Sequence, residues 1–264
     1  MAGKREGRTG RGSKERGSKG RGSTGRERAG RKSAPPGIIS VSRVIWRPSW
    51  RIVPSRFPPI GLFDRVANPA DLEAVFALEA MTNDRLRDEA GELSLVAPED
   101  RISGPGSTAV MAAFTHLNPE GSRFSDGTWG VYYAGDRLET AIAETRHHRA
   151  RFLAATSQPR IEIDMRVYQA DIDAGLHDLR GRAGEMPDVY DPADYGGGQR
   201  LARRLRDGGS AGVVYDSVRL AGAACVAVFR PKAIGPARQE RHLCYIWNGK
   251  AIEQVYEKRA LEGA

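Results

Sequence analysis

The first 33 residues of this 264-residue chain contain no side chain that could build a hydrophobic core. After Met1, residues 2–33 consist only of Gly, Arg, Ser, Lys, Thr, Glu and Ala. Such a segment cannot bury enough apolar surface to offset the conformational entropy that ordering would cost. We therefore expect residues 1–36 to be a disordered tail and residues 37–264 to form one folded domain, a length that suffices for a single core.

The charge of the chain follows the same division. Residues 1–33 carry twelve basic and three acidic residues, a net charge of +9, whereas the whole chain carries +8. The other 231 residues are therefore nearly neutral, at −1. A basic tail is typical of nucleic-acid-binding arms, but also of solvated tails or an over-extended gene start, and this one has no aromatic residue for base stacking. The charge thus supports contact with nucleic acid only through the tail.

Several classes of protein are excluded. The longest apolar stretches, such as 221–229, are too short to span a bilayer, and no apolar segment follows the charged N-terminus. Cys225 and Cys244 lack zinc-site spacing and lie in apolar, strand-like sequence, which is typical of free cysteines in a reducing compartment. His147 and His148 are adjacent, so on a helix they would not share a face and would make a poor metal site on a solvated surface. We expect a cytoplasmic protein with no membrane association and no metal.

The apolar pattern predicts a mixed α+β domain with most of its strands in the second half. Asn68-Pro69 is expected to open a helix that runs to about residue 89. A helix that starts at Asp136 is expected to bury Phe152 and Leu153. The other predicted elements are strands at 38–50, 129–134, 160–167, 213–215, 223–229 and 242–247, helices at 107–114 and 199–206, and loops at 91–106 and 187–198.

The most informative run of residues lies between 121 and 144. It places Arg123 in a turn that follows a glycine, Tyr133 near the end of a strand, and Glu144 about two turns into the next helix. Well downstream, the segment Tyr215-Asp216-Ser217-Val218-Arg219 ends a short apolar strand. Each of these motifs is short, and only their order and spacing make the combination specific.

In this order and spacing the chain resembles the RES domain family, which is named for its Arg, Glu and Ser, over about residues 50–235. Arg123, Tyr133 and Glu144 fit the family's arginine turn, aromatic strand and glutamate helix. Ser217 fits the later Tyr-x-Ser-x-Arg segment, and Arg56 best fits an earlier arginine that precedes an aromatic residue. The chain departs from the family pattern at Ser122, Phe124 and Phe57, which stand in place of Gly, Trp and Tyr, and Arg51 and Arg65 compete with Arg56.

The resemblance implies an ADP-ribosyltransferase-like fold and NAD as the substrate. Family members characterised as toxins of toxin–antitoxin pairs consume NAD, and a neighbouring helix-turn-helix antitoxin normally silences such a toxin. We therefore predict an NAD glycohydrolase or phosphorylase that cleaves the nicotinamide–ribose bond and passes the ADP-ribosyl group to water or inorganic phosphate. The alternatives are transfer of ADP-ribose to a macromolecule and a non-enzymatic protein that binds nucleic acid through its tail.

The residue types suit this chemistry. Arginine forms bidentate, permanently charged hydrogen bonds with phosphates, which makes Arg56 and Arg123 candidates for binding the diphosphate. Tyr133 could stack on the nicotinamide or order the ribose. Glu144 would stabilise the positive charge that develops on the ribose during cleavage. Ser217 would hydrogen-bond the ribose or the nicotinamide, but no base is evident that would make it a nucleophile.

Each of these residues also has a purely structural interpretation. Glu144 could make a surface contact with His148 one turn away on the same helix. Arg123 could anchor a turn and Tyr133 could belong to the core. Ser217 could cap a local turn.

Overall fold

The computed structural model describes residues 37–55, 63–65, 68–69 and 91–261. They belong to one compact unit, Pro36–Ala264. The expected tail, the body of the helix expected after Asn68-Pro69, and the Arg56-Phe57 pair lie outside the described residues. Among the helices within these ranges, none is long and apolar enough to cross a membrane.

The described residues form a mixed sheet with few helices, an α+β fold, as predicted. The strands are β1 (Val41–Pro54), β2 (Tyr132–Gly135), β3 (Ile161–Asp178), β4 (Gly212–Asp216), β5 (Ala224–Val228), β6 (Arg238–Trp247) and β7 (Ile252–Lys258). The α-helices are α3 (Ser107–Thr115), α4 (Leu138–Ala155), α5 (Pro187–Tyr190) and α6 (Gly196–Asp207). Short 3-10 turns are η1 (Phe63–Arg65), η3 (Leu93–Leu95), η4 (Pro98–Asp100) and η5 (Pro231–Ala233).

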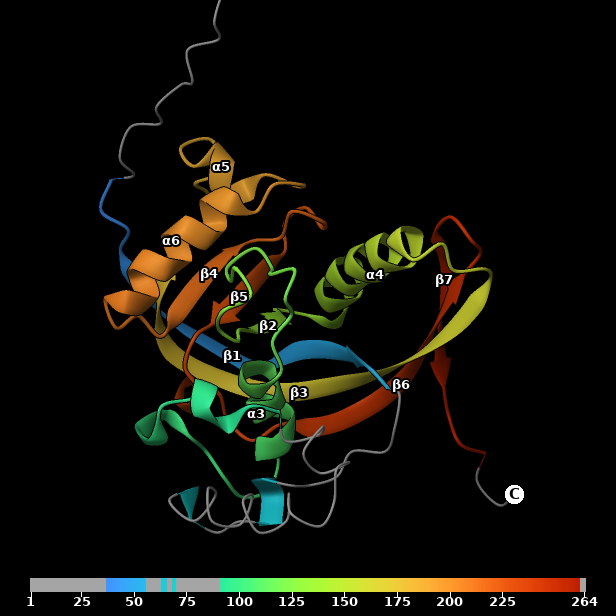
Figure 1. The fold of residues 1–264 in the computed structure, drawn as a ribbon, viewed down its shortest axis with the longest axis horizontal. Coiled ribbons are helices and arrows are strands. Elements are labelled where there is room, and N and C mark those ends of the chain that lie inside the picture. Colours follow the sequence, from blue (N-terminus) through green and yellow to red (C-terminus); the bar gives the residue numbers. More distant parts are fainter. Residues whose placement is uncertain (1–36, 56–62, 66–67, 70–90, 262–264) are drawn as a thin grey trace, which may run out of the picture. The chain divides into compact units, whose positions relative to one another are not determined.

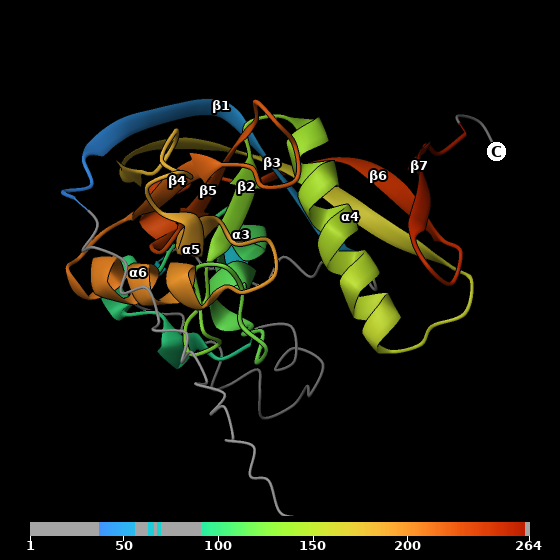
Figure 2. The same cartoon turned by 90° about the horizontal axis from the view of Figure 1, so that it is seen from above.

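The sheet has seven strands in the order β1-β2-β5-β4-β3-β6-β7, and β1 also pairs with β3. The pairings therefore run in a ring through β1, β2, β5, β4 and β3, and β6 and β7 extend from β3. Most pairs are antiparallel, but β3 and β4 are parallel. Figures 1 and 2 show β4 and β5 beside α5 and α6 at one end, and β6 and β7 beside α4 at the other.

The strand β3 has 18 residues and continues well beyond the predicted end at Val167. Its apolar side chains change sides there: Met165 and Val167 are buried in one core, whereas Ala170 and Ile172 are buried in another. The pairing register with β6 shifts between Arg166 and Tyr168, and such a bulge changes which alternate residues face a given side. The break in alternation marks this bulge, not the end of the strand.

Three clusters of buried residues fill the fold, and different helices cover them. Residues of α3 pack into the first cluster with β1, β2 and the second half of β3. Residues of α5 and α6 pack on β4 and β5 in the second. Residues of α4 pack on the first half of β3 and on β6 in the third. The strands β2, β4 and β5 therefore lie between α4 and the α5–α6 pair, where the predicted site residues are found.

Several predicted elements need correction. Leu153 is buried as expected, but Phe152 is 55% exposed, because neighbouring residues on a helix point about 100° apart. The strand expected from residue 129 begins at Tyr132. The predicted loop at 187–198 contains α5 and the start of α6. The strand β7 was not predicted, since charged residues interrupt its apolar pattern.

Candidate active site

The close approach of β2 to α4 places Glu144. A Cβ atom on Gly135, the last residue of β2, would lie 2.7 Å from Cβ of Thr140, so only glycine fits. The Thr140 hydroxyl donates to the Asp136 carboxylate at 2.6 Å, and the Asp136 amide donates to the carbonyl of Ala224 in β5 at 3.0 Å. These contacts fix the first turn of α4 against the sheet, and Glu144 follows one turn later.

Glu144 and Ser217, 73 positions apart in the chain, meet in the fold. The Ser217 hydroxyl donates to Oε1 of Glu144 at 2.7 Å, and Sγ of Cys225 in β5 lies 3.7 Å from the same oxygen. Neither contact uses Oε2 of Glu144. The Ser217 hydroxyl also accepts the amides of Arg219 and Leu220, so it caps a local turn and holds the carboxylate. Both interpretations of Ser217 therefore agree with its contacts.

Two groups near Glu144, the Cys225 thiol and the Tyr215 hydroxyl, keep their protons. Burial and the charge of Glu144 raise the pKa of the Cys225 thiol well above its usual value. Burial first, then Cys225 and Glu144, likewise raise the pKa of Tyr215 in β4. Because both groups keep their protons at neutral pH, each can act as a hydrogen-bond donor next to the carboxylate. Cys225 was predicted only as a small apolar residue, and its place beside Glu144 follows from β5 pairing with β4.

Arg123 is buried and is held by its own chain. Its Nη1 donates to the carbonyl of Val189 at 2.7 Å and to that of Asp191 at 2.9 Å. Gly198 of α6 lies so close below that a Cβ atom there would be 2.3 Å from the Arg123 carbonyl oxygen. With 7% of its surface exposed, Arg123 ties the turn before β2 to the segment between α5 and α6.

Tyr133 also holds this turn. Its hydroxyl lies 2.7 Å from the Ser122 hydroxyl and accepts the Phe124 amide at 2.9 Å. Burial raises the pKa of Tyr133 to about 12, so the hydroxyl stays neutral at physiological pH. The Tyr133 carbonyl accepts a hydrogen bond from Nη1 of Arg51 in β1 at 3.1 Å. The turn that carries Arg123 is thus fixed from both sides.

Three further polar residues share the helix face of Glu144. His147, His148 and Arg151 follow it at spacings of three, four and seven residues, which repeat one face of a helix. From the sequence, His148 was expected at most to make a surface contact with Glu144, and His147 was not related to Glu144 at all. The signal that could have found them is their spacing from Glu144, and His147 is not simply solvated, since its Nε2 is buried.

Tyr195, just before α6, lies opposite this face. The guanidinium carbons of Arg123 and Arg151 lie 4.8 Å and 5.8 Å from its ring centroid, and the ring of His148 lies at 6.4 Å. Close by, Nη2 of Arg219 donates to the carbonyl of Pro192 at 2.5 Å. The structure therefore brings together Arg123, Tyr133, Glu144 and Ser217 of the predicted site, whereas Arg56 lies outside the described residues.

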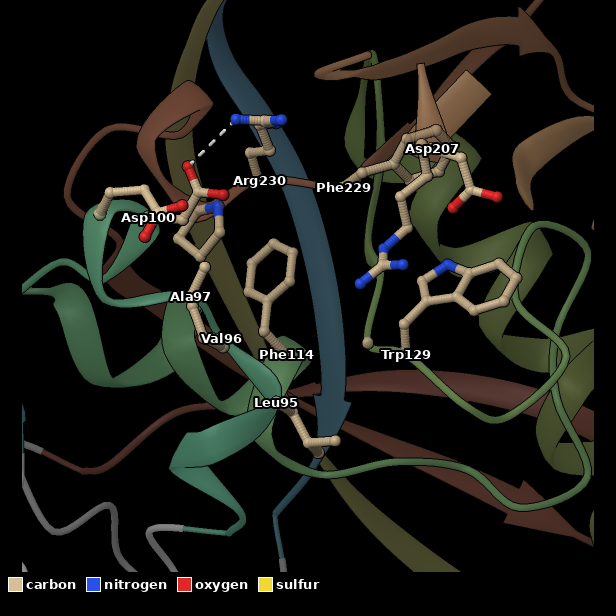
Figure 3. A pocket seen from close by; sticks show the side chains of 13 residues that line it. Leu95, Val96, Ala97, Asp100, Phe114, Trp129, Asp207, Phe229 and Arg230 are labelled. Carbon is tan, nitrogen blue, oxygen red and sulfur yellow. Dashed lines mark ion pairs between the residues drawn. The ribbon is translucent and has the colours of Figure 1, made fainter. Parts of the chain in front are cut away.

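A separate cavity of about 290 Å³ opens elsewhere, between η4 and the end of α6. Its lining includes Phe114, Trp129 and Arg206, but neither Glu144 nor Ser217 (Figure 3). The guanidinium of Arg206 lies 5.4 Å from the Trp129 ring, and Arg230 pairs with Asp100 at 3.6 Å. Both cations of this cavity therefore already have partners within the chain. We place the candidate active site around Glu144 and Ser217, because the predicted site residues within the described ranges converge there. Within the described ranges, no group of three His, Cys, Asp or Glu side chains could hold a metal ion.

Comparison with known proteins shows which family and which solved structures this chain is similar to. The family model described as RES domain matches residues 98–248. The uncharacterized protein y4oC of Sinorhizobium fredii is 32% identical over 212 residues, which span 78% of this chain and 86% of that protein. A crystal structure of the M. tuberculosis MbcT–MbcA toxin–antitoxin complex matches with a TM-score of 0.43 and 12% identity, over 80% of this chain and 88% of that one.

Proposed function

Since this chain belongs to the RES domain family, we propose that it degrades NAD by breaking the bond between nicotinamide and ribose. The observation that carries the proposal is the 2.7 Å hydrogen bond from Ser217 to Glu144. It joins the two residues that the family pattern selects, and it leaves Oε2 of the carboxylate unused by that contact. The proposal extends what the family resemblance implies to these particular side chains.

In the proposed reaction, the bond between C1′ of the ribose and N1 of nicotinamide breaks. Its electron pair leaves with N1, so nicotinamide departs as a neutral molecule and the positive charge moves onto the ribose. Glu144 stabilises this oxocarbenium-like state more than the ground state, because its carboxylate faces a charge that grows during cleavage. An oxygen of water or of inorganic phosphate then bonds to C1′, and water loses its proton to the solvent. The products are ADP-ribose or its 1′-phosphate.

Ser217 and Cys225 orient the carboxylate in this scheme. Hydrogen bonds from Ser217 and from the protonated thiol fix Oε1 of Glu144. Oε2 is thereby held toward the ribose before the reaction, so the Glu144 side chain loses little entropy in the transition state. Ser217 is held in turn by two backbone amides. No nucleophilic role for Ser217 is required, since nicotinamide is already a good leaving group.

The test is NAD consumption by the purified full chain, measured as nicotinamide release by chromatography. We expect turnover by the wild type and at least a roughly 100-fold decrease in kcat for Glu144→Gln, the order seen when one charge-stabilising group is removed. Glu139→Gln is the matched control, because this exposed glutamate lies on the same helix, away from Ser217. No turnover by the wild type, or equal rates for both variants, would refute the proposal.

The acceptor is decided by the products. Mass spectrometry in phosphate buffer and in phosphate-free buffer separates phosphorolysis from hydrolysis. Incubation of labelled NAD with lysate tests the alternative of transfer to a macromolecule, since a labelled protein or nucleic acid would favour it.

Deleting residues 1–36 tests the role of the tail. We expect unchanged NAD turnover, and loss of a salt-dependent DNA affinity would assign nucleic-acid binding to the tail alone.

We further propose that the chain is the toxin of a toxin–antitoxin pair, the role that the RES resemblance implies. Its partner would be a small helix-turn-helix protein that covers the active site, and the reaction would take place in the cytoplasm, where NAD is found. Expression of the wild type should stop growth, whereas Glu144→Gln should not. Co-expression of a helix-turn-helix protein encoded next to this chain should restore growth, and failure to do so would remove that protein as the antitoxin.

A further inference from the structure

We infer that Arg151 and Arg219, with the hydroxyl of Tyr195, hold the diphosphate of the dinucleotide, whereas Arg123 serves to fix the loop beneath it. This inference rests on the proposed function, because it assigns a part of the same substrate to residues outside the predicted set. Four observations support it: the hydrogen bonds of Arg123, the surroundings of the other two arginines, two buried polar atoms, and the spacing along α4.

The first observation concerns the hydrogen bonds of Arg123. Its Nη1 is used by the carbonyls of Val189 and Asp191, and its guanidinium is packed against Tyr195. Turning this group toward a phosphate would leave two carbonyls without their donor, at a cost similar to the expected gain. Arg123 is therefore a positioning residue for the segment that carries Tyr195.

The second observation is that Arg151 and Arg219 meet no carboxylate within the described ranges. Arg151 is exposed and its guanidinium lies over the Tyr195 ring, and half-buried Arg219 contacts the carbonyl of Pro192. Folding gains little from placing two such cations next to the buried Arg123, because like charges repel. A dianionic ligand between them would remove this repulsion and accept hydrogen bonds from both.

The third observation is that two residues around His148 each have a buried polar atom without a partner among the described residues. Oη of Tyr195 and Nε2 of His147 are buried and have no hydrogen-bond partner within the described ranges. Buried polar atoms are nearly always satisfied, so each of these atoms indicates a missing partner. Both residues neighbour His148, whose ring lies 5.4 Å from that of His147 and 6.4 Å from that of Tyr195. Burial of the imidazole and the charges of three arginines lower the pKa of His147, which places it among the same cations. The three are Arg219, Arg151 and Arg123.

The fourth observation is the spacing of the two functions along α4. Glu144 and Arg151 are seven residues apart, about 10 Å along the axis of a helix. In NAD, a single ribose separates the bond that breaks from the diphosphate. The face of α4 can thus contact the ribose with Glu144 while the long side chain of Arg151 reaches the phosphates. Because the body of the chain is almost neutral, its affinity for an anion must come from such locally placed charges.

The test measures binding of ADP-ribose by titration calorimetry, alongside turnover of NAD, with the full chain. We expect Arg219→Gln to weaken binding about 10- to 50-fold and the more exposed Arg151→Gln about 5- to 10-fold. Both should raise KM for NAD more than they lower kcat. Affinity for nicotinamide riboside, which has no phosphate, should stay unchanged. Arg149→Gln is the matched control, since Arg149 lies on another face of α4 against Phe152.

The outcomes separate this inference from the proposed function. If the wild type turns over NAD and binds ADP-ribose but both variants bind it equally well, only this inference fails. An equal loss of affinity for nicotinamide riboside would show that the arginines act through the fold, and overturns it too. If the variants bind ADP-ribose normally and only their NAD turnover no longer responds to inorganic phosphate, the arginines bind the acceptor phosphate. That result also contradicts this inference. A wild type that neither binds nor cleaves NAD refutes both.

Discussion

Arg123 and Arg151 both approach the ring of Tyr195, but their surroundings differ. Arg123 is buried, and backbone carbonyls accept its hydrogen bonds. Arg151 is exposed, and within the described ranges it pairs with no carboxylate. The same contrast separates Tyr133, whose hydroxyl makes two hydrogen bonds, from Tyr195, whose hydroxyl has no partner in the described part of the chain. In the inference above, groups satisfied by the chain itself build the site, and the unsatisfied groups bind the ligand.

The largest expected difference between the two regions is in stability. Arg123→Ala should lower the free energy of unfolding by about 3 kcal/mol, because it leaves two buried carbonyls without a hydrogen-bond donor and creates a cavity. Arg151→Ala should change it by less than about 0.5 kcal/mol, as expected for an exposed side chain. Urea denaturation measures both. If Arg123→Ala is as stable as the wild type, Arg123 belongs with the ligand-binding groups and the contrast is lost.

The tyrosine pair gives a smaller and cleaner comparison, since each variant removes a single oxygen. Tyr133→Phe should lower the free energy of unfolding by about 1–2 kcal/mol, because the Phe124 amide and the Ser122 hydroxyl lose their partner. Tyr195→Phe should leave stability within about 0.5 kcal/mol of the wild type, because its hydroxyl has no partner to lose among the residues that the structure describes. It should instead weaken ADP-ribose binding. Equal effects of the two variants on stability would contradict this assignment.

The smallest expected effect concerns the thiol below Glu144. Burial and the Glu144 charge raise the pKa of Cys225, so little thiolate is present at pH 8 and alkylation of the folded protein should be slow. Glu144→Gln removes the charge, which should lower the thiol pKa and modestly increase its labelling rate. Peptide mass mapping after iodoacetamide treatment follows Cys225, with buried Cys244 as the internal reference. No change in rate would contradict an effect of Glu144 on the Cys225 thiol.

Sequence reasoning could reach those parts of the site that lie in short local motifs. The order of motifs was enough to select Glu144 and Ser217, which the fold brings into contact. It could not give the partners of Arg123, since Val189 and Asp191 are more than 60 positions away and are reached only through α5. Tyr195 carries no motif and becomes relevant only through the packing of α6 against the arginine turn.

The fold shows a similar limit. Local alternation predicted the first half of β3, but the bulge after Arg166 reverses the pattern, and only pairing with β1 shows that the strand continues. The contact of Glu144 with Cys225 depends on β5 lying between β2 and β4, an order that local periodicity does not encode. Periodicity predicts elements, whereas the site depends on which elements become neighbours.

The ring of pairings through β1, β2, β5, β4 and β3 also decides where this chain could recruit a foreign strand. Strands in that ring have neighbours on both sides, whereas β7 pairs with β6 alone among the described strands. An open strand edge is a template for aggregation, and natural proteins protect it with charged side chains. Glu253, Glu257 and Lys258 lie along β7, with Arg259 just beyond it. Charged side chains thus protect the open β7 edge of the described sheet against pairing with another chain.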